Sequence, residues 1–204
     1  MSFKWIFDNA ETITMETKRV VASTQSRDGT YRAVSRGGQY WRFEVKMPEG
    51  MRFTQWRGYI AKMEELDRLT SERIYMDNVG QRWLWGYQGN SVNSTGFAAS
   101  ITNGSKNITL TTSPNTPSGF KFKAGDLIQP VPDGKVYKVA ADVPFNSNSV
   151  TLHRPILEPT VSPVGLRVGL NVDFNLICRD FPSFTLFARD QISWSGPFVF
   201  VEVI

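Results

Sequence analysis

The sequence is poor in the residues that most often carry chemistry. Among 204 residues there is one cysteine, Cys178, and one histidine, His153. A lone cysteine forms no disulfide within the chain, and a zinc site needs several His or Cys ligands. A Ser–His–Asp triad on a Gly-x-Ser-x-Gly elbow is excluded as well, because the sequence contains no such elbow.

Phosphate-binding loops and long apolar runs are missing too. Gly86-Tyr87-Gln88-Gly89 is followed by neither Gly-Lys-Ser/Thr nor the further glycines of a dinucleotide loop. The first residues hold no apolar run long enough for a signal peptide, and no segment approaches membrane-spanning length. We therefore expect a soluble protein made in the cytosol that is not an enzyme, with no catalytic, cofactor-binding or metal-binding residues. A glycosidase that uses only paired carboxylates leaves no local signature and stays open.

What the sequence does contain is an abrupt change of composition in its middle third. Between Ser91 and Gly119, 21 of 29 residues are Ser, Thr, Asn, Gly or Pro, and none is Asp or Glu. Segments with strand-like patterns lie on both sides, and neither looks complete alone. Because insertions are tolerated where the cut ends of a host lie close together at its surface, we expect two domains. Residues 1–90 and 166–204 form a discontinuous β-rich host, and residues 91–165 form a small inserted barrel.

The first segment alternates between strands and turns. Thr12 to Ala22 has strand propensity, and Arg27-Asp28-Gly29-Thr30 is typical of a hairpin turn. A second strand begins at Tyr31, and Gly37-Gly38 predicts a turn or bulge before it resumes. In Gln39–Lys46 the side chains of Trp41, Phe43 and Val45 point to one face, which we expect to be core.

One main helix is predicted from about Phe53 to Leu69. Apolar residues recur there at three- and four-residue steps. Glu64 and Glu65 are adjacent, so they diverge by about 100° around the helix and cannot flank one scissile bond. We expect both on a solvated face.

The middle segment has short strand candidates with regular turn signals between them. The candidates are Asn107–Thr111, Asp126–Gln129, Lys135–Val139 and Ser149–Leu152. This spacing predicts a small barrel of the OB or SH3-like kind. An OB-type surface that grips single-stranded nucleic acid combines stacking aromatics with cations. The residues that could do so are Phe97, Phe120, Phe122, Tyr137 and Phe145 with Lys121, Lys123, Lys135 and Lys138.

The last segment closes the host. From Leu166 to Leu176 apolar side chains fill every even position, which predicts one long amphipathic strand. Phe184–Phe187 and Phe198–Ile204 add further strands. The fold class expected from all three segments is mainly β.

Several of these stretches resemble the distal tail proteins of long-tailed bacteriophages. One is Thr30–Phe43, with its Arg36-Gly37-Gly38-Gln39-Tyr40-Trp41 core; the others are Lys123–Ile128, Lys135–Val139 and Leu152–Leu157, in that order. The resemblance covers about residues 10–165 and rests on turns and strands rather than reactive groups. It implies a tail-tube-like β-sandwich or split barrel carrying an inserted OB-like domain. Trp83-Leu84-Trp85 aligns with no motif of that family.

The resemblance also implies a structural role in the virion. Proteins of that family form a ring, expected here to be a hexamer, that joins the tail tube protein to the tip or baseplate hub and adjoins receptor-binding proteins. They are made in the host cytoplasm, lie at the distal end of the tail and do not read nucleic-acid sequence or insert into a membrane. Arg36, Gly37, Gly38, Gln39 and Trp41 are the candidate assembly or turn motif. The alternatives are an OB-type single-stranded nucleic-acid binder, and a carbohydrate-binding or carbohydrate-active protein.

Overall fold

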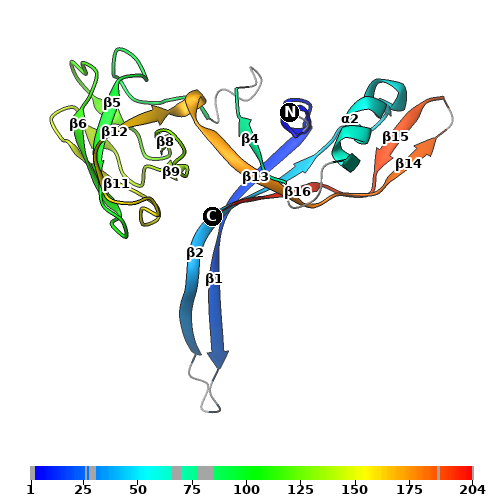
Figure 1. The fold of residues 1–204 in the computed structure, drawn as a ribbon, viewed down its shortest axis with the longest axis horizontal. Coiled ribbons are helices and arrows are strands. Elements are labelled where there is room, and N and C mark those ends of the chain that lie inside the picture. The colour runs from blue at the N-terminus through cyan, green and yellow to red at the C-terminus, as the bar shows by residue number, and fades with distance from the viewer. Residues whose placement is uncertain are drawn as a thin grey trace. The chain divides into compact units, whose positions relative to one another are not determined.

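The computed structural model describes residues 3–25, 27, 31–65, 70–77, 85–187 and 189–203. The expected mainly-β class is confirmed, since strands dominate and helices are few. The finer description, a tail-tube-like sandwich or split barrel with an OB-like insertion, stays a prediction. The chain forms two compact units (Figure 1): unit 1 comprises Met1–Ile74 and Asn175–Ile204, and unit 2 comprises Tyr75–Phe174.

The described part of unit 1 is built on two sheets and two α-helices. The larger sheet has five strands in the order β1-β2-β16-β13-β4, and the smaller has three in the order β14-β15-β3. The strands are β1 (Thr12–Gln25), β2 (Tyr31–Lys46), β3 (Met51–Arg52), β4 (Glu72–Tyr75), β13 (Asp173–Asp180), β14 (Phe184–Phe187), β15 (Gln191–Trp194) and β16 (Phe198–Glu202). The helices are α1 (Lys4–Asp8) and α2 (Phe53–Glu65).

The predicted hairpin at the start of the chain is the pair β1–β2. Its register runs from Thr12 opposite Lys46 to Gln25 opposite Tyr31. Gly37-Gly38 makes a bulge rather than a turn, because β2 continues through it while the register shifts between Arg19 and Val21. Of the predicted turn, residues 28–30 lie outside the described part of the chain.

Aromatic side chains fill the core of unit 1. Trp41, Phe43 and Val45 are buried as the alternation predicts, and Phe200 on β16 lies opposite Phe43. The short helix α1, which the sequence patterns did not predict, places Phe7 against this layer, with its ring 4.9 Å from that of Phe200. Phe3, Ile6 and Phe7 are therefore part of the core of unit 1.

The predicted helix is present as α2, and Trp56, Ile60 and Met63 form its buried stripe while Glu64 and Glu65 are exposed. The expected last residues, 66–69, lie outside the described part of the chain. The helix is capped from a distant position in the sequence. Asp190 accepts hydrogen bonds at its two carboxylate oxygens from the Thr54 backbone N–H (3.0 Å) and from the Thr54 hydroxyl (2.5 Å). A carboxylate there satisfies an orphan N–H and also lies at the positive end of the helix dipole.

Removing this cap is expected to weaken unit 1. Asp190 has φ of +63°, which Asn tolerates and Ala does not. We expect Asp190→Ala to lower the free energy of unfolding by about 1–2 kcal/mol. The Asn variant keeps an acceptor and should lose less. Urea unfolding and amide exchange of peptides from α2 measure both. Equal stability of the Ala and wild-type proteins would contradict the cap.

Unit 2 is a small barrel. Its strands are β5 (Phe97–Ile101), β6 (Asn107–Thr112), β7 (Phe120–Phe122), β8 (Leu127–Pro130), β9 (Tyr137–Lys138), β10 (Val143–Pro144), β11 (Ser149–Thr151) and β12 (Val161–Val168). Six of them form a sheet in the order β11-β6-β5-β12-β8-β9, and β7 pairs with β10. A bridge between Val139 and Leu152 joins the two edges of the six-stranded sheet. The four strand candidates of the middle segment correspond to β6, β8, β9 and β11.

The prediction of one long strand at Leu166–Leu176 is wrong, because the structure has two strands there. They are separated by the 3-10 turn η2 (Gly169–Asn171), where Gly169 has φ of +60°. Alternation of apolar residues continues on both sides of the break, so the pattern did not reveal it. The first part belongs to β12, which pairs with β5 and β8, and the second part belongs to β13.

The unit boundaries consequently differ from those expected at 90 and 165. Unit 2 begins at Tyr75 and ends at Phe174. Trp85 is buried and packs its ring 6.2 Å from that of Phe174. Tyr87 likewise packs against Phe97 and Phe122 of the barrel. The segments flanking the predicted insertion thus supply part of its core.

Candidate functional site

The candidate assembly motif lies on β2, partly in its bulge and partly in the core of unit 1. Arg36 and Gly37 lie in the bulged part of β2, and their side chains are outside the described set. Gly38 is exposed and Gln39 is half-buried, whereas Trp41 is buried in the core. The Trp41 backbone N–H donates to Oε2 of the buried Glu202. Trp41 therefore holds the sheet together, and any contact with a partner would fall to the bulge.

The single histidine, His153, and the single cysteine, Cys178, each form a hydrogen bond with the protein backbone. Nδ1 of His153 accepts a hydrogen bond from the Lys138 backbone N–H at 2.9 Å, which supports the closure of the barrel. Cys178 is buried in β13, and its thiol donates weakly to the Asp180 carbonyl at 3.6 Å. Neither residue lines the two pockets described below.

The residues expected to grip single-stranded nucleic acid are mostly used inside the barrel. Phe97, Phe122 and Tyr137 are buried core residues. Lys121 is also buried, and its ammonium donates to the Ser147 carbonyl and to Asn148 Oδ1. The other predicted residues lie nearer the surface. They are the cation–π pair of Lys123 over Phe120 at 4.1 Å, the half-buried Lys135 and Lys138, and the exposed ring of Phe145.

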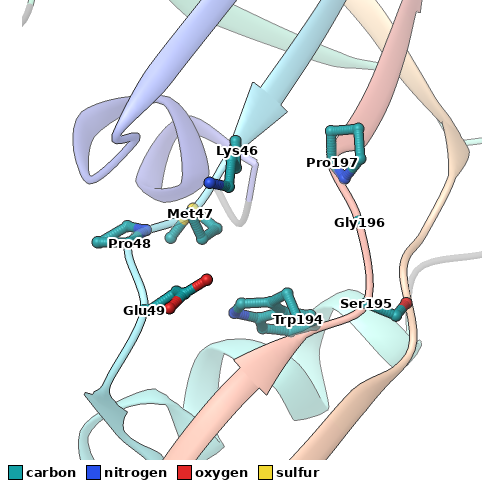
Figure 2. Close-up of a pocket in the computed structure, with 8 residues that line it drawn as sticks. All are labelled: Lys46, Met47, Pro48, Glu49, Trp194, Ser195, Gly196 and Pro197. Carbon is teal, nitrogen blue, oxygen red and sulfur yellow. The ribbon is translucent and has the colours of Figure 1, made fainter.

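Unit 1 contains a small pocket between two chain connections (Figure 2). One connection, Lys46–Glu49, leads from β2 to β3; the other, Trp194–Pro197, leads from β15 to β16. The pocket has a volume of about 140 Å³. The Trp194 indole Nε1 is buried there without a hydrogen-bond partner among the described residues. Figure 2 shows the Glu49 carboxylate, on the opposite connection, toward the edge of the indole that carries this nitrogen. A space this small suits ordered water better than an organic ligand, for which pockets of roughly 300–1,000 Å³ are usual.

Unit 2 has a larger open groove of about 580 Å³. Its lining is mixed, with the residues Tyr75, Asp77, Ser94, Thr95, Gly96, Leu166, Arg167, Leu170 and Asn171. They come from the end of β4, the polar segment before β5, the end of β12 and the turn η2. The interruption at Gly169 matters here, because it bends the chain so that Leu170 and Asn171 meet the polar segment at one groove.

Arg167 is the one cation among the described residues of this lining, and a buried network positions it. Its Nη1 donates to Oδ2 of Asp173 at 3.0 Å. Asp173 is 2% exposed, and its Oδ1 accepts from Gln129 Nε2 at 2.6 Å. Gln129 is itself 2% exposed and accepts from the Asp173 backbone N–H at 2.9 Å. A guanidinium anchored to a buried carboxylate in this way has a defined orientation.

A second buried carboxylate ties the segment before β5 to the barrel. Asp126 is 2% exposed. Its Oδ1 accepts from the Gln88 backbone N–H and its Oδ2 from that of Lys123, each at 2.8 Å. Burial raises the pKa of Asp126 above its usual 3.8, and the two backbone hydrogen bonds oppose the rise.

This shift predicts a pH-dependent contribution to stability. Because the pKa of Asp126 is higher in the folded state, its favourable contribution is complete below pH 3.8 and is lost as pH rises through the folded pKa. The Asp126→Asn variant does not titrate there. We expect the stability of the wild type relative to this variant to fall in urea unfolding as the pH rises from 3.8 through the folded-state pKa of Asp126. A relative stability that rises over this range would contradict the direction.

Neither pocket offers a pair of carboxylates on its lining. The unit 1 pocket has Glu49 and the unit 2 groove has Asp77. Within the described ranges, no group of three His, Cys, Asp or Glu residues could hold a metal ion. Nor does any described helix have the length and apolarity to cross a membrane. The expectation that the protein is not an enzyme stays a prediction.

Comparison of the chain with models of known protein families and with curated protein sequences gave no match.

Proposed function

We propose that this protein is a structural component of a phage tail, forming a ring at its distal end that joins the tail tube to the tip or baseplate hub. Two observations support the proposal: the resemblance of the turn and strand motifs to those of distal tail proteins, and the long β1–β2 hairpin of unit 1. Its partners are further copies of the chain, the tail tube protein and the hub protein. Binding these requires free strand edges and surfaces rather than reactive groups.

The feature that carries the proposal is the unsupported length of the β1–β2 hairpin. Strand β16 pairs with β2 only between Arg42 and Val45. From Tyr31 to Trp41, β2 pairs with β1 alone among the described strands, so the hairpin continues as a two-stranded ribbon beyond β16 (Figure 1). Isolated two-stranded hairpins are marginally stable in water, and open edges pair with other strands. A neighbouring subunit would stabilise this ribbon.

The proposal predicts that shortening the ribbon weakens assembly without unfolding unit 1. Residues 22–34 are replaced by Asn-Gly, which suits a two-residue hairpin turn. We expect the wild type to form six-fold particles with the tube and hub proteins. The shortened variant should need at least about tenfold more protein to do so. Light scattering after size exclusion and negative-stain electron microscopy measure assembly, and circular dichroism follows the fold.

A matched control is Phe145→Ser, which alters an exposed aromatic residue of unit 2 and should leave assembly unchanged. A wild type that stays monomeric with both partners present would overturn the ring. Six-fold particles formed equally well by the shortened variant would leave the ring standing and remove the ribbon from its interface.

A further inference from the structure

Strand β14 forms an open edge of the smaller sheet of unit 1 (Figure 1). The strand order is β14-β15-β3, so among the described strands β14 pairs on one side only, with β15. Proteins usually protect such edges with charged side chains, prolines or bulges, because an open edge pairs with any available strand. The sequence of β14, Phe184-Thr185-Leu186-Phe187, has no charge and no proline, and its register with β15 is regular. The edge is therefore unprotected.

The backbone groups of Phe184 and Leu186 face outward at this edge. The Ser195 N–H donates to the Ser183 carbonyl at 2.8 Å, which makes these two residues a hydrogen-bonded pair. Hydrogen-bonded and non-hydrogen-bonded pairs alternate along an antiparallel ladder. Thr185 therefore bonds to β15, whereas the N–H and C=O groups of Phe184 and Leu186 point away from β15. They are placed to bond a further strand.

Two apolar side chains of β14 are exposed because the sheet ends there. Leu186 lies opposite Ile192 and shares its face of the sheet, yet Ile192 is fully buried and Leu186 is 53% exposed. Phe187, on the other face, is 55% exposed. Burial of apolar surface favours association. A strand added at this edge would cover Leu186 as β14 itself covers Ile192.

The charges near β14 favour an antiparallel second copy of the same strand. Between Asp180 and Arg189 the chain carries no charge, so two copies can meet along β14 without repulsion. At one end Asp180 lies 4.0 Å from Arg179, and at the other end Arg189 is exposed. Parallel pairing would place Arg189 beside Arg189, and like charges in such positions are destabilising. Antiparallel pairing instead brings Arg189 toward the end with the Arg179–Asp180 pair.

We infer that β14 pairs with β14 of a second copy of this chain, around a two-fold axis at Thr185. Phe184 of each copy lies opposite Leu186 of the other, so their outward backbone groups bond each other and the Phe184 ring covers the exposed Leu186 side chain. The same patch serves both copies, as a two-fold contact requires. The inference does not depend on the proposed ring, whose ribbon belongs to the larger sheet.

The first test is sedimentation of the full-length protein over a series of concentrations. Because β14 has only 4 residues, we expect a weak dimer with a Kd of about 10–500 μM. Leu186→Lys places a charge on the edge and should raise this Kd about tenfold or more. The matched control is Val161→Lys, an aliphatic residue of β12 in unit 2 that is 45% exposed. It should leave the Kd unchanged.

The second test is disulfide cross-linking across the two-fold axis. In the dimer Thr185 faces Thr185 in a non-hydrogen-bonded pair, with Cα atoms about 4.5 Å apart, and a disulfide accepts about 4.4–6.8 Å. We expect Thr185→Cys to form covalent dimers at least about tenfold faster than the control Gln191→Cys, an exposed position of β15, because pairing raises the local thiol concentration. The wild type, whose one cysteine is the buried Cys178, should form none.

The dimer should persist in the variant with the shortened ribbon, and circular dichroism shows that all variants are folded. These measurements omit the tube and hub proteins, so the dimer and the six-fold ring can each fail without the other. Three results would overturn the inference: a wild type that stays monomeric above the expected Kd, a Leu186→Lys variant that dimerises as well as the wild type, and equal cross-linking of the two cysteine variants. Loss of the dimer on shortening the ribbon would overturn it too, since the contact would then lie in the larger sheet.

Discussion

Gly169→Ala is expected to destabilise unit 2 by about 3 kcal/mol, through backbone strain and a steric clash together. Gly169 has φ of +60°, a conformation that costs any residue with a Cβ. An added Cβ would also lie 2.8 Å from the Tyr87 backbone nitrogen and 3.3 Å from the Trp85 carbonyl oxygen. These atoms belong to the backbone, so they cannot move aside as a flexible side chain could.

The matched control is Gly165→Ala in the neighbouring strand β12. Its Cβ would meet Val131 Cγ2 at 3.8 Å, an ordinary contact. We expect this variant to stay within about 1 kcal/mol of the wild type. Urea unfolding monitored by amide exchange of peptides from 85–174 isolates unit 2. Equal stabilities of the two alanine variants would contradict the packing of η2 against the segment at Trp85–Tyr87.

Tyr137→Phe is expected to cost unit 2 about 2 kcal/mol, although it removes one oxygen atom. The Tyr137 hydroxyl donates to Glu158 Oε2 at 2.5 Å and accepts from the Leu157 backbone N–H at 2.9 Å. Burial and the Glu158 carboxylate raise the pKa of Tyr137, so the phenol stays protonated and keeps donating. The Phe variant removes the hydrogen bonds to the Glu158 carboxylate and to the Leu157 backbone N–H. The Tyr137 ring is fully buried.

Tyr59→Phe serves as the control, because it removes a hydroxyl from a ring that is 38% exposed. We expect it to change the free energy of unfolding by less than about 0.5 kcal/mol. The double variant Tyr137→Phe/Glu158→Gln tests the pairing further. If the two changes are fully additive, the bond between these side chains does not contribute to stability.

The alternation of apolar and polar side chains predicted strands that have one buried and one exposed face. It did not predict the break at Gly169, because the alternation continues through it. Trp41, Phe43 and Val45 are buried as expected, because one face of β2 meets the core and the other does not. The break at Gly169 kept the apolar positions in phase, so it shows only in the structure, as the 3-10 turn η2 and the positive φ of Gly169. A glycine in a strand pattern is ambiguous from sequence, since it fits a bulge, a bend or an ordinary strand.

The helix cap and the groove could not be read from the sequence for a different reason. Asp190 and Thr54 are 136 positions apart, and no local pattern connects them. The groove likewise combines Tyr75 with Arg167 and Asn171, which appeared in the sequence as parts of unrelated strands. The change of composition predicted only that the polar segment at Ser94 and Thr95 belongs to an inserted module. Its partners depended on the tertiary fold.

The strand order of unit 1 has a consequence for synthesis on the ribosome. Strand β16 lies between β2 and β13 in the sheet, yet it is translated after every other strand of that sheet. Unit 2 is contiguous in the sequence and can fold before β16, the sheet neighbour of β2, has been translated. During this interval the inner edge of β2 and the apolar face of Trp41 and Phe43 are uncovered, which favours association with other nascent chains. A pause in translation after residue 174 would lengthen that exposure. A chaperone that covers β2 would reduce the association with other nascent chains.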